Sequence, residues 1–477
     1  MSAIKPLHAA MLDHDLFGRT FAGPTFDAWR CVAKIIDGLP LTEPELALFR
    51  QITGRTAAPS KAFDEAYLIK PRRAGGTLFA AAVALHAALD DYRAKLGPGE
   101  YATVALIASD RKQARQAFNY VKGLIEDAEM IKAEVMNETA ETITFAHRVN
   151  LEVHTTSFRS TRGYSYAAVI LDELAFFRDD LSANPDIELI RAVRPGLSNL
   201  HGRLLGLSSP HSRRGHLFEM HRQHYGQEGD AVLVIQAPHS VLNPTIDQAV
   251  IDRAMAEDPE AARSEWFGEF RSDVSQYLPD ALIDAAIIPG RTELPFSRDC
   301  GYVAFADMSG GVNDAAVLGI AHKAPGTRLE NVVLDQLIVE PAPHEPHEVC
   351  ARFAAVLQRF GLRTASGDRY GAEWVVNAFK HHNIRYEPAT LDKSAIYGEV
   401  SHLFAEKRVE LLDSRRLSTE LRLLERRPRS GGRGDSVDHP PRAHDDTANA
   451  ACGALWLAST KRALPAGNRQ QFEYSIT

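Results

Sequence analysis

The stretch Ala167-Ala168-Val169-Ile170-Leu171-Asp172-Glu173 decides the fold class of this 477-residue chain. Its apolar residues are typical of a strand that is buried on both faces, and two carboxylates follow directly. The carboxyl end of such a strand is where α/β proteins bind their ligands. We therefore expect Asp172 to hold a magnesium ion and Glu173 to orient and polarise an attacking water molecule. The simpler alternative is a strand that ends in an exposed acidic turn.

The apolar part of this stretch is one of six short apolar runs that helical stretches separate. The runs lie at Ala66–Ile69, Ala102–Ala108, Leu151–Thr155, Ala168–Leu171, Arg203–Leu207 and Ala231–Gln236. Strands that alternate with helices are typical of a parallel sheet with crossover helices. The sequence therefore predicts an α/β fold for residues 61–245, and a second alternating unit is expected at residues 296–460.

A basic, glycine-containing segment, Lys70-Pro71-Arg72-Arg73-Ala74-Gly75-Gly76-Thr77, follows the first of these strands. A phosphate loop needs small residues so that its backbone N–H groups can wrap an anion at the start of a helix. Gly75 and Gly76 provide that freedom, and the Thr77 hydroxyl lies where such a loop binds Mg²⁺. The segment therefore predicts a nucleotide site. A turn that happens to carry basic residues is the alternative.

The lysine of this loop is in an unusual place. The usual phosphate-loop pattern has glycine at position 70 and lysine at position 76, whereas this chain has Lys70 and Gly76. The positive charge must then come from Lys70, Arg72 or Arg73. Lys70 is the best candidate, because its long stem could fold back over the loop.

Two further features fit a nucleotide-hydrolysing protein. Arg162 precedes the Asp-Glu strand and could place a guanidinium against the γ-phosphate, although an ordinary surface arginine is the simpler interpretation. Another strand ends in Ser208-Ser209, and its end could sense hydrolysis and couple it to movement.

The second half of the chain carries carboxylates at three separated positions. Asp307 ends an apolar strand, Asp368 follows a short Gly-containing segment, and Asp445 and Asp446 precede a helix. A small set of carboxylates can bridge two Mg²⁺ or Mn²⁺ ions, which then clamp the attacking and leaving oxygens of a phosphodiester. This order of acids is that of RNase H-like nucleases, so Asp307, Asp368 and Asp446 are the expected catalytic residues. An exposed turn or helix cap is the simpler interpretation of each acid by itself.

Some assignments around these acids stay open. Both Asp445 and Asp446 are candidate metal ligands, and we favour Asp446 slightly. We expect Asp314 to be an accessory residue and Asp335 to be structural. The arginine-rich segment Arg415–Arg433 is either a solvated helix face followed by a loop or a phosphate-contacting patch.

Composition narrows the class of protein. The net charge of −8 argues against a protein that coats nucleic acid, although a local basic patch suffices for a transient grip. The four cysteines form no CxxC pair, which disfavours a zinc site or a disulfide framework. No apolar run reaches the roughly 20 residues of a membrane helix, and the N-terminus lacks the pattern of a secretion signal. We therefore expect a cytoplasmic protein that does not enter a membrane.

These motifs together resemble the large-subunit family of tailed-phage terminases. The resemblance covers most of the chain and is carried by Phe26–Arg30, Leu41-Thr42, Phe49–Arg55, Pro71–Thr77, Ile170–Glu173, Phe267–Phe270 and Val437–Ala450. It implies an N-terminal P-loop ATPase that uses ATP and Mg²⁺ to drive double-stranded DNA into a procapsid. It also implies a C-terminal RNase H-like nuclease that uses Mg²⁺ or Mn²⁺ to cut concatemeric DNA.

The same resemblance implies partners and a domain plan. The partners are a terminase small subunit and the portal protein, and the chain would be a homo-oligomer when docked and a monomer in solution, in the host cytoplasm. We expect a helical lid at 1–60, the ATPase at 61–245, a connecting region at 246–295, the nuclease at 296–460 and a loose tail at 461–477.

The chain departs from the family at two positions. Many members have lysine where this chain has Gly76, and a further aspartate where it has Asn449. The first departure motivates an alternative, a nuclease whose ATPase domain is degenerate and does not hydrolyse ATP. A non-enzymatic alternative is a DNA-binding or capsid-assembly adaptor that uses the Arg415–Arg433 segment.

Overall fold

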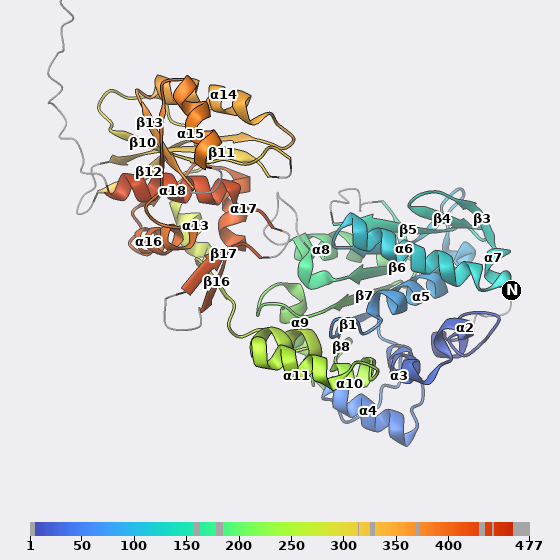
Figure 1. Ribbon diagram of the computed structural model, residues 1–477. Helices are drawn as coiled ribbons and strands as arrows, with labels where there is room; N and C mark the ends of the chain where they lie inside the picture. The colour runs from blue at the N-terminus through green and yellow to red at the C-terminus, as the bar shows by residue number, and fades with distance from the viewer. Residues whose placement is uncertain are drawn as a thin grey trace, which may run out of the picture. The chain divides into compact units, whose positions relative to one another are not determined.

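The computed structural model describes residues 5–156, 163–177, 185–312, 314–324, 330–368, 372–428, 435–440 and 443–460 (Figure 1). The described chain divides into two compact units between Asp273 and Val274. Residues 1–60 belong to the first unit. The expected connecting region is shared, since 246–273 pack with the first unit and 274–295 with the second. The tail predicted at 461–477 lies outside the described residues.

The first unit contains a sheet with the strand order β3-β4-β5-β2-β6-β7-β1-β8. The strands are β1 (Glu65–Ile69), β2 (Ala102–Ala108), β3 (Val135–Glu138), β4 (Thr142–Phe145), β5 (Val149–Thr155), β6 (Ser165–Asp172), β7 (Arg203–Ser208) and β8 (Val232–Gln236). From β5 to β8 every neighbouring pair is parallel, which confirms the predicted parallel sheet. The antiparallel strands β3 and β4 were not predicted, because β3 is largely exposed and has no apolar run.

Helices cover both faces of this sheet. They are α1 (Leu7–Ala10), α2 (Gly18–Phe21), α3 (Asp27–Ile36), α4 (Glu43–Thr53), α5 (Gly76–Ala88), α6 (Arg111–Glu126), α7 (Glu129–Lys132), α8 (Pro185–Leu197), α9 (His216–His224), α10 (His239–Leu242), α11 (Gln248–Glu257) and α12 (Pro259–Ala262). Short turns of helix are η1 (Pro24–Phe26), η2 (Arg93–Lys95), η3 (Leu174–Phe176) and η4 (Arg263–Phe267). Alternate strand residues face opposite ways: Leu68 packs in the core with α3, α5 and α6, whereas Ile69 packs in the core with α8 and α9.

The second unit contains a sheet with the order β14-β13-β10-β11-β12-β15. Its strands are β10 (Tyr302–Asp307), β11 (Ala316–Ala324), β12 (Asn331–Glu340), β13 (Thr364–Gly367), β14 (Arg385–Pro388) and β15 (Val409–Glu410). The pairs β10–β11 and β11–β12 are antiparallel, while β13 and β14 join β10 in parallel. This mixed order, with the first strand at the centre, is RNase H-like, as predicted.

The helices of the second unit lie on two sides of its sheet (Figure 1). One face carries α14 (Pro346–Arg359) and α15 (Ala372–His381), and the other carries α18 (Asp446–Thr460). Packed against α18 are α16 (Lys393–Ala405) and α17 (Arg415–Leu423), and α13 (Asp280–Ala286) packs against these two helices. A small sheet is formed by β9 (Ser275–Gln276), β16 (Glu425–Pro428) and β17 (Asp435–Asp438). Throughout the described ranges, no helix has both the length and the apolar character needed to cross a membrane.

Candidate active sites

The predicted phosphate loop joins β1 to α5. Its backbone is held by two side chains that are distant in sequence: Trp29 Nε1 donates to the Ala74 carbonyl at 2.8 Å, and Asn243 Nδ2 donates to the Arg73 carbonyl at 2.7 Å. Gly75 takes a left-handed conformation (φ 83°) as the N-cap of α5. The loop is therefore fixed at a helix N-terminus, where the helix dipole favours an anion. Trp29 and Asn243 carry no local signal that would have assigned them this role.

Lys70 lies across the loop and meets Glu173. The Lys70 side chain is 4% exposed, and its Nζ is 2.7 Å from Glu173 Oε1. Burial alone would lower the pKa of Lys70, but the carboxylates of Glu173 and Asp172 outweigh burial and raise it. Burial alone would raise the pKa of Glu173, but Lys70 outweighs burial and lowers it. Both groups are therefore charged in this state, as a phosphate-binding lysine and an acceptor for water should be.

Gly76 is explained by the course of the Lys70 stem. A Cβ atom at position 76 would lie 2.2 Å from Lys70 Cε and 2.3 Å from Lys70 Cδ, closer than such atoms approach. The space that a side chain would need at position 76 is thus filled by the lysine that enters from position 70. The two departures from the usual loop pattern compensate for each other.

Asp172 fits a magnesium ligand. It is fully buried at the end of β6, and neither of its carboxylate oxygens has a hydrogen-bond partner among the described residues. Burial raises its pKa to about 6, against the opposing charge of Lys70. A buried carboxylate is costly unless a cation or donors compensate it. A divalent ion next to Asp172 and the Thr77 hydroxyl would supply that compensation.

Strand register brings the third part of this site into place. Ile69 of β1 pairs with Ser208 of β7, and β6 lies on the other side of β7. Glu173 Oε2 accepts from Ser209 N at 3.2 Å and from Ser208 Oγ at 3.3 Å. The backbone of Glu173 has a left-handed conformation (φ 60°). This conformation costs a non-glycine residue free energy and is found mostly at functional sites. The hydroxyl-bearing strand end therefore contacts the predicted catalytic glutamate directly.

The predicted arginines of this site are not gathered at Glu173. The Arg72 side chain is 59% exposed and pairs with Glu265 at 3.1 Å. Arg73 is exposed, and its carbonyl rather than its guanidinium is what anchors the loop. Arg162 lies outside the described residues. Of the basic residues in the loop, Lys70 alone makes the buried contact expected of a phosphate ligand.

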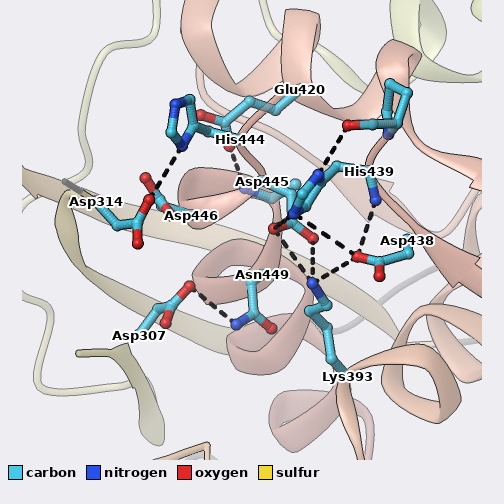
Figure 2. A network of polar contacts seen from close by, with 12 residues as sticks. Asp307, Asp314, Lys393, Glu420, Asp438, His439, His444, Asp445, Asp446 and Asn449 are labelled. Carbon is cyan, nitrogen blue, oxygen red and sulfur yellow. Dashed lines mark hydrogen bonds and ion pairs between the residues drawn. The ribbon is translucent and has the colours of Figure 1, made fainter. Parts of the chain in front are cut away.

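A second polar site lies in the RNase H-like unit, where the separated acids converge (Figure 2). Asp307 ends β10, and Asp368 follows the neighbouring parallel strand β13, so that the two lie side by side. Asp445 and Asp446 lie at the start of α18. All four line one cavity of about 780 Å³. The structure thus brings together every nuclease residue predicted from the sequence.

Asp445 and Asp446 have different surroundings. Asp445 accepts a hydrogen bond from the Tyr397 hydroxyl at 2.8 Å and is 3.0 Å from Lys393 Nζ. Asp446 is 3.0 Å from Arg416 Nη2 and accepts from Ala315 N at 3.3 Å. Asp445 is therefore tied to two residues of α16, the buried Tyr397 and the half-buried Lys393. Asp446 belongs to a group with Asp314 and His444 whose ligand atoms could reach one ion, and Asp445 belongs to a second such group with Asp438 and His439.

Asn449 lies one turn into α18 and was expected only as a departure from the family. Its Nδ2 donates to Asp307 Oδ2 and to Asp368 Oδ2, both at 2.9 Å. The side chain is buried, with 2% of its residue surface exposed. The amide thus bridges the carboxylates of Asp307 and Asp368. Its identity could be read from the sequence, but its bridging position could not.

The pKa values of three acids in this site are raised, as expected for carboxylates that lie close together without a cation. Burial, followed by the charge of Asp368, raises the pKa of Asp307 well above its ordinary value. Burial also raises the pKa of Asp368 and of Asp446. Clustered carboxylates that cost free energy to ionise together are relieved by a bound ion. Asp307, Asp368 and Asp446 stay the predicted metal ligands, and of the three only Asp446 belongs to a group of described residues whose ligand atoms all lie within 4.8 Å of one another.

Two further acids were predicted to be accessory and structural, Asp314 and Asp335 respectively. Asp314 is exposed, and its Oδ1 lies 3.3 Å from His444 Nδ1 at the rim of the cavity, as an accessory residue would. Asp335 is buried in a pair with His322, 2.7 Å from its Nδ1, and does not line the cavity.

The arginine-rich segment is largely paired with acids of its own unit. Arg416 contacts Glu420 and Asp446, and Arg422 contacts Asp280 and Asp284. In the small sheet, Arg426 lies 3.8 Å from Asp435 and Arg427 lies 2.7 Å from Glu425. Arg429 and Arg433 lie outside the described residues. The paired arginines favour a structural role over a free phosphate-contacting patch.

Comparisons with known proteins bear on the fold. No protein-family model and no curated protein matches the sequence. The crystal structure of the HK97 bacteriophage large terminase matches 91% of this chain and 100% of its own, at 16% identity and a TM-score of 0.38. The large terminase of a thermophilic bacteriophage matches 88% of this chain and 99% of its own, at 12% identity and a TM-score of 0.36.

A third match covers a smaller part of the chain. The large terminase nuclease from thermophilic phage G20c, with bound magnesium, matches 38% of this chain and 96% of its own, at 16% identity and a TM-score of 0.33. The chain is similar in structure to phage large terminases over most of its length. At these identities the similarity concerns the fold alone.

Proposed function

We propose that this chain is the large subunit of a tailed-phage terminase, which hydrolyses ATP to drive double-stranded DNA into a procapsid and cuts concatemeric DNA with a metal-dependent nuclease. The observation that carries the proposal is the presence of two separate, assembled sites on one chain. One is a phosphate loop closed by the contact between Lys70 and Glu173, and the other is the convergence of Asp307, Asp368 and Asp446. A translocating nuclease needs both.

The first site supports ATP hydrolysis. Lys70 and the N–H groups at the start of α5 would bind the phosphates, and Asp172 with Thr77 would hold Mg²⁺, which neutralises charge on them. Binding of a phosphate would draw Lys70 away from Glu173. Glu173 would then be free to orient the attacking water. Its contacts with Ser208 and Ser209 give β7 a direct route to respond to that change.

The second site supports phosphodiester cleavage. Asp307, Asp368 and Asp446 would hold Mg²⁺ or Mn²⁺, which supplies charge stabilisation at the attacking and leaving oxygens. Asp445 would keep Lys393 and Tyr397 in place at the cavity edge. The cavity is open enough to admit a phosphate group, given its volume of about 780 Å³.

The partners follow from the proposed function. They are double-stranded DNA, a terminase small subunit that selects it, and the portal protein on which the chain would assemble as a homo-oligomer, with a monomer in solution. The host cytoplasm is the proposed location. The paired arginines of residues 415–428 favour this enzymatic proposal over a DNA-binding adaptor.

The ATPase is tested by turnover of the full chain with DNA and Mg²⁺. Glu173→Gln should lower kcat by about 10²–10⁴-fold while nucleotide binding persists, because the water loses its acceptor. Glu138→Gln, at the exposed edge strand β3, is the matched control and should leave turnover unchanged. Wild-type turnover that survives Glu173→Gln would refute the assigned role.

The nuclease is tested by cleavage of linear DNA with Mg²⁺ or Mn²⁺. Asp307→Asn should abolish cutting, and Asp299→Asn, on the exposed segment before β10, should not. Cleavage together with an absence of ATP turnover, even with small subunit and portal added, would favour the alternative of a nuclease with a non-hydrolysing ATPase domain. Cleavage that persists in Asp307→Asn would refute the nuclease assignment.

A further inference from the structure

Asn449 occupies the centre of the nuclease site. Its two Nδ2–H bonds to Asp307 and Asp368 place one neutral amide between two carboxylates. Figure 2 shows the amide nitrogen turned towards Asp307 and the amide oxygen turned away from it. Two neighbouring carboxylates repel each other when both are charged. The two N–H donors of Asn449 lie between Asp307 and Asp368 and keep these acids together when no cation is present.

The oxygen of the same amide has no partner. Asn449 Oδ1 is buried and accepts no hydrogen bond from any residue in the described ranges. A buried acceptor without a donor costs free energy. Asn449 lines a cavity whose other polar residues are six aspartates together with Ser309, Lys393, His439 and His444. Amide oxygens are ordinary ligands of hard divalent cations. The site therefore contains one unused ligand atom on the residue that already contacts both acids.

The amide can exchange its two ends without moving the helix. Rotation about the terminal bond of an asparagine side chain is broad and roughly two-fold. A half turn would take the NH₂ group away from Asp307 and Asp368 and bring Oδ1 into its place. That exchange suits a cation, which needs oxygens where the metal-free site needs hydrogens.

We propose that Asn449 is an amide placeholder at the metal position: it donates to Asp307 and Asp368 without metal, and turns to present Oδ1 as a neutral ligand when a divalent ion enters. The inference rests on the proposed nuclease function and deepens it. A neutral ligand in this place gives the site one negative charge fewer than a carboxylate would. Asn449 therefore lowers the affinity of the site for the metal ion, and it keeps the acids of the site in place when no ion is bound.

The test measures Mn²⁺ binding to the full chain by calorimetry without nucleotide, and the part of the signal that Asp307→Asn removes is assigned to the nuclease site. Asn449→Asp should bind Mn²⁺ about tenfold or more tightly than wild type, because a carboxylate attracts the ion more strongly. Asn449→Ala should bind about tenfold more weakly. Asn331→Asp, at the start of β12, adds the same charge outside the cavity and should leave affinity unchanged.

Thermal unfolding provides a second readout that does not depend on cleavage. Without metal, the Tm of Asn449→Asp should fall several degrees below that of wild type, because three carboxylates then meet without a donor. Mn²⁺ should restore it. A metal-free Asn449→Asp protein as stable as wild type would overturn the donor role.

The failures of the two proposals are distinguishable. Unchanged Mn²⁺ affinity in both Asn449→Asp and Asn449→Ala, with binding still lost in Asp307→Asn, would overturn the placeholder and leave the nuclease intact. If Asn449→Asp does not fold, unchanged affinity in Asn449→Ala is sufficient to overturn it. An absence of Asp307-dependent binding in every protein would overturn both.

Discussion

The identity of several single residues in this chain is explained by the side chain that each one contacts. Gly76 has no side chain because the Lys70 stem runs where its Cβ would be. Lys70 in turn is buried against Glu173, 103 positions later in the sequence. A substitution at any one of these three residues therefore disturbs the other two.

Gly76→Ala should weaken nucleotide binding about tenfold or more. The added Cβ overlaps the Lys70 stem at 2.2–2.3 Å, so the lysine must leave its place over the loop. Titration with a fluorescent nucleotide measures the effect. Gly123→Ala is the matched control, since a Cβ there meets nothing within 4 Å on helix α6. Equal affinity in Gly76→Ala and wild type would contradict the proposed course of Lys70.

Asp307 gives the metal-free protein a characteristic pH dependence. Its pKa is raised by burial and by Asp368, so the folded state retains a proton that the unfolded chain releases above its ordinary value of 3.8. The free energy of unfolding should therefore fall as pH rises from about 4 through the raised pKa, by about 1.4 kcal/mol for each unit of the shift.

Asp307→Asn should remove this contribution. In chelator, the variant should be more stable than wild type near about pH 8, and the difference should vanish near about pH 4. Urea denaturation across that range measures it, with Asp299→Asn as a control that follows wild type. A variant that is less stable than wild type at the higher pH would contradict the assigned shift.

Among the elements, helix α18 depends on a cap that another helix supplies. Glu420 on α17 accepts from Thr447 N at 2.7 Å, from Ala448 N at 2.9 Å and from the Thr447 hydroxyl. Its other oxygen accepts from Arg416 Nε at 2.8 Å. Since Arg416 also contacts Asp446, this cap positions both the start of α18 and one predicted metal ligand.

Glu420→Ala should destabilise the second unit by about 1–3 kcal/mol, because it leaves helix N–H groups unpaired and Arg416 without its partner. Chemical denaturation followed by circular dichroism measures the loss. Glu399→Ala, on an exposed position of α16, removes a similar side chain and should cost well under that amount. Equal losses in the two variants would argue against the cap.

At the scale of the whole molecule, the division at Asp273 and Val274 has an energetic basis. The segment 274–295 contributes Tyr277, Leu278 and Ile283 to the core beneath α18. Tyr277 also donates its hydroxyl to the Tyr397 carbonyl at 2.7 Å. The second unit therefore begins earlier than the boundary at residue 296 expected from the sequence.

A fragment of residues 274–477 should unfold cooperatively and be stabilised by Mn²⁺. A fragment of residues 296–477 should be less stable by several kcal/mol, because fully burying each large apolar side chain contributes about 1.5–3 kcal/mol. Thermal and urea unfolding of the two fragments compares them. Equal stability would show that 274–295 is a linker after all.

Much of this architecture could be predicted because local patterns encode it. The apolar runs of β1, β2, β5, β6, β7 and β8 mark a buried parallel sheet, and the segment Lys70–Thr77 marks a turn that only small residues permit. Carboxylates at strand ends and at a helix start predict the acids that line the cavity of the second unit. The exposed strands β3 and β4 lacked such a pattern and were missed.

The sequence by itself determined the parallel strands of the first sheet, the place of the loop and the acids that are available, because each depends on neighbours a few residues away. Only the tertiary structure decided that Lys70 meets Glu173, that Asn243 anchors the loop from 170 positions away, that Glu420 caps α18 and that Asn449 bridges Asp307 and Asp368. Each of these contacts joins segments that meet only when separate helices and strands pack together. That packing is driven by the burial of apolar surface over a whole unit, and no local sequence pattern encodes it.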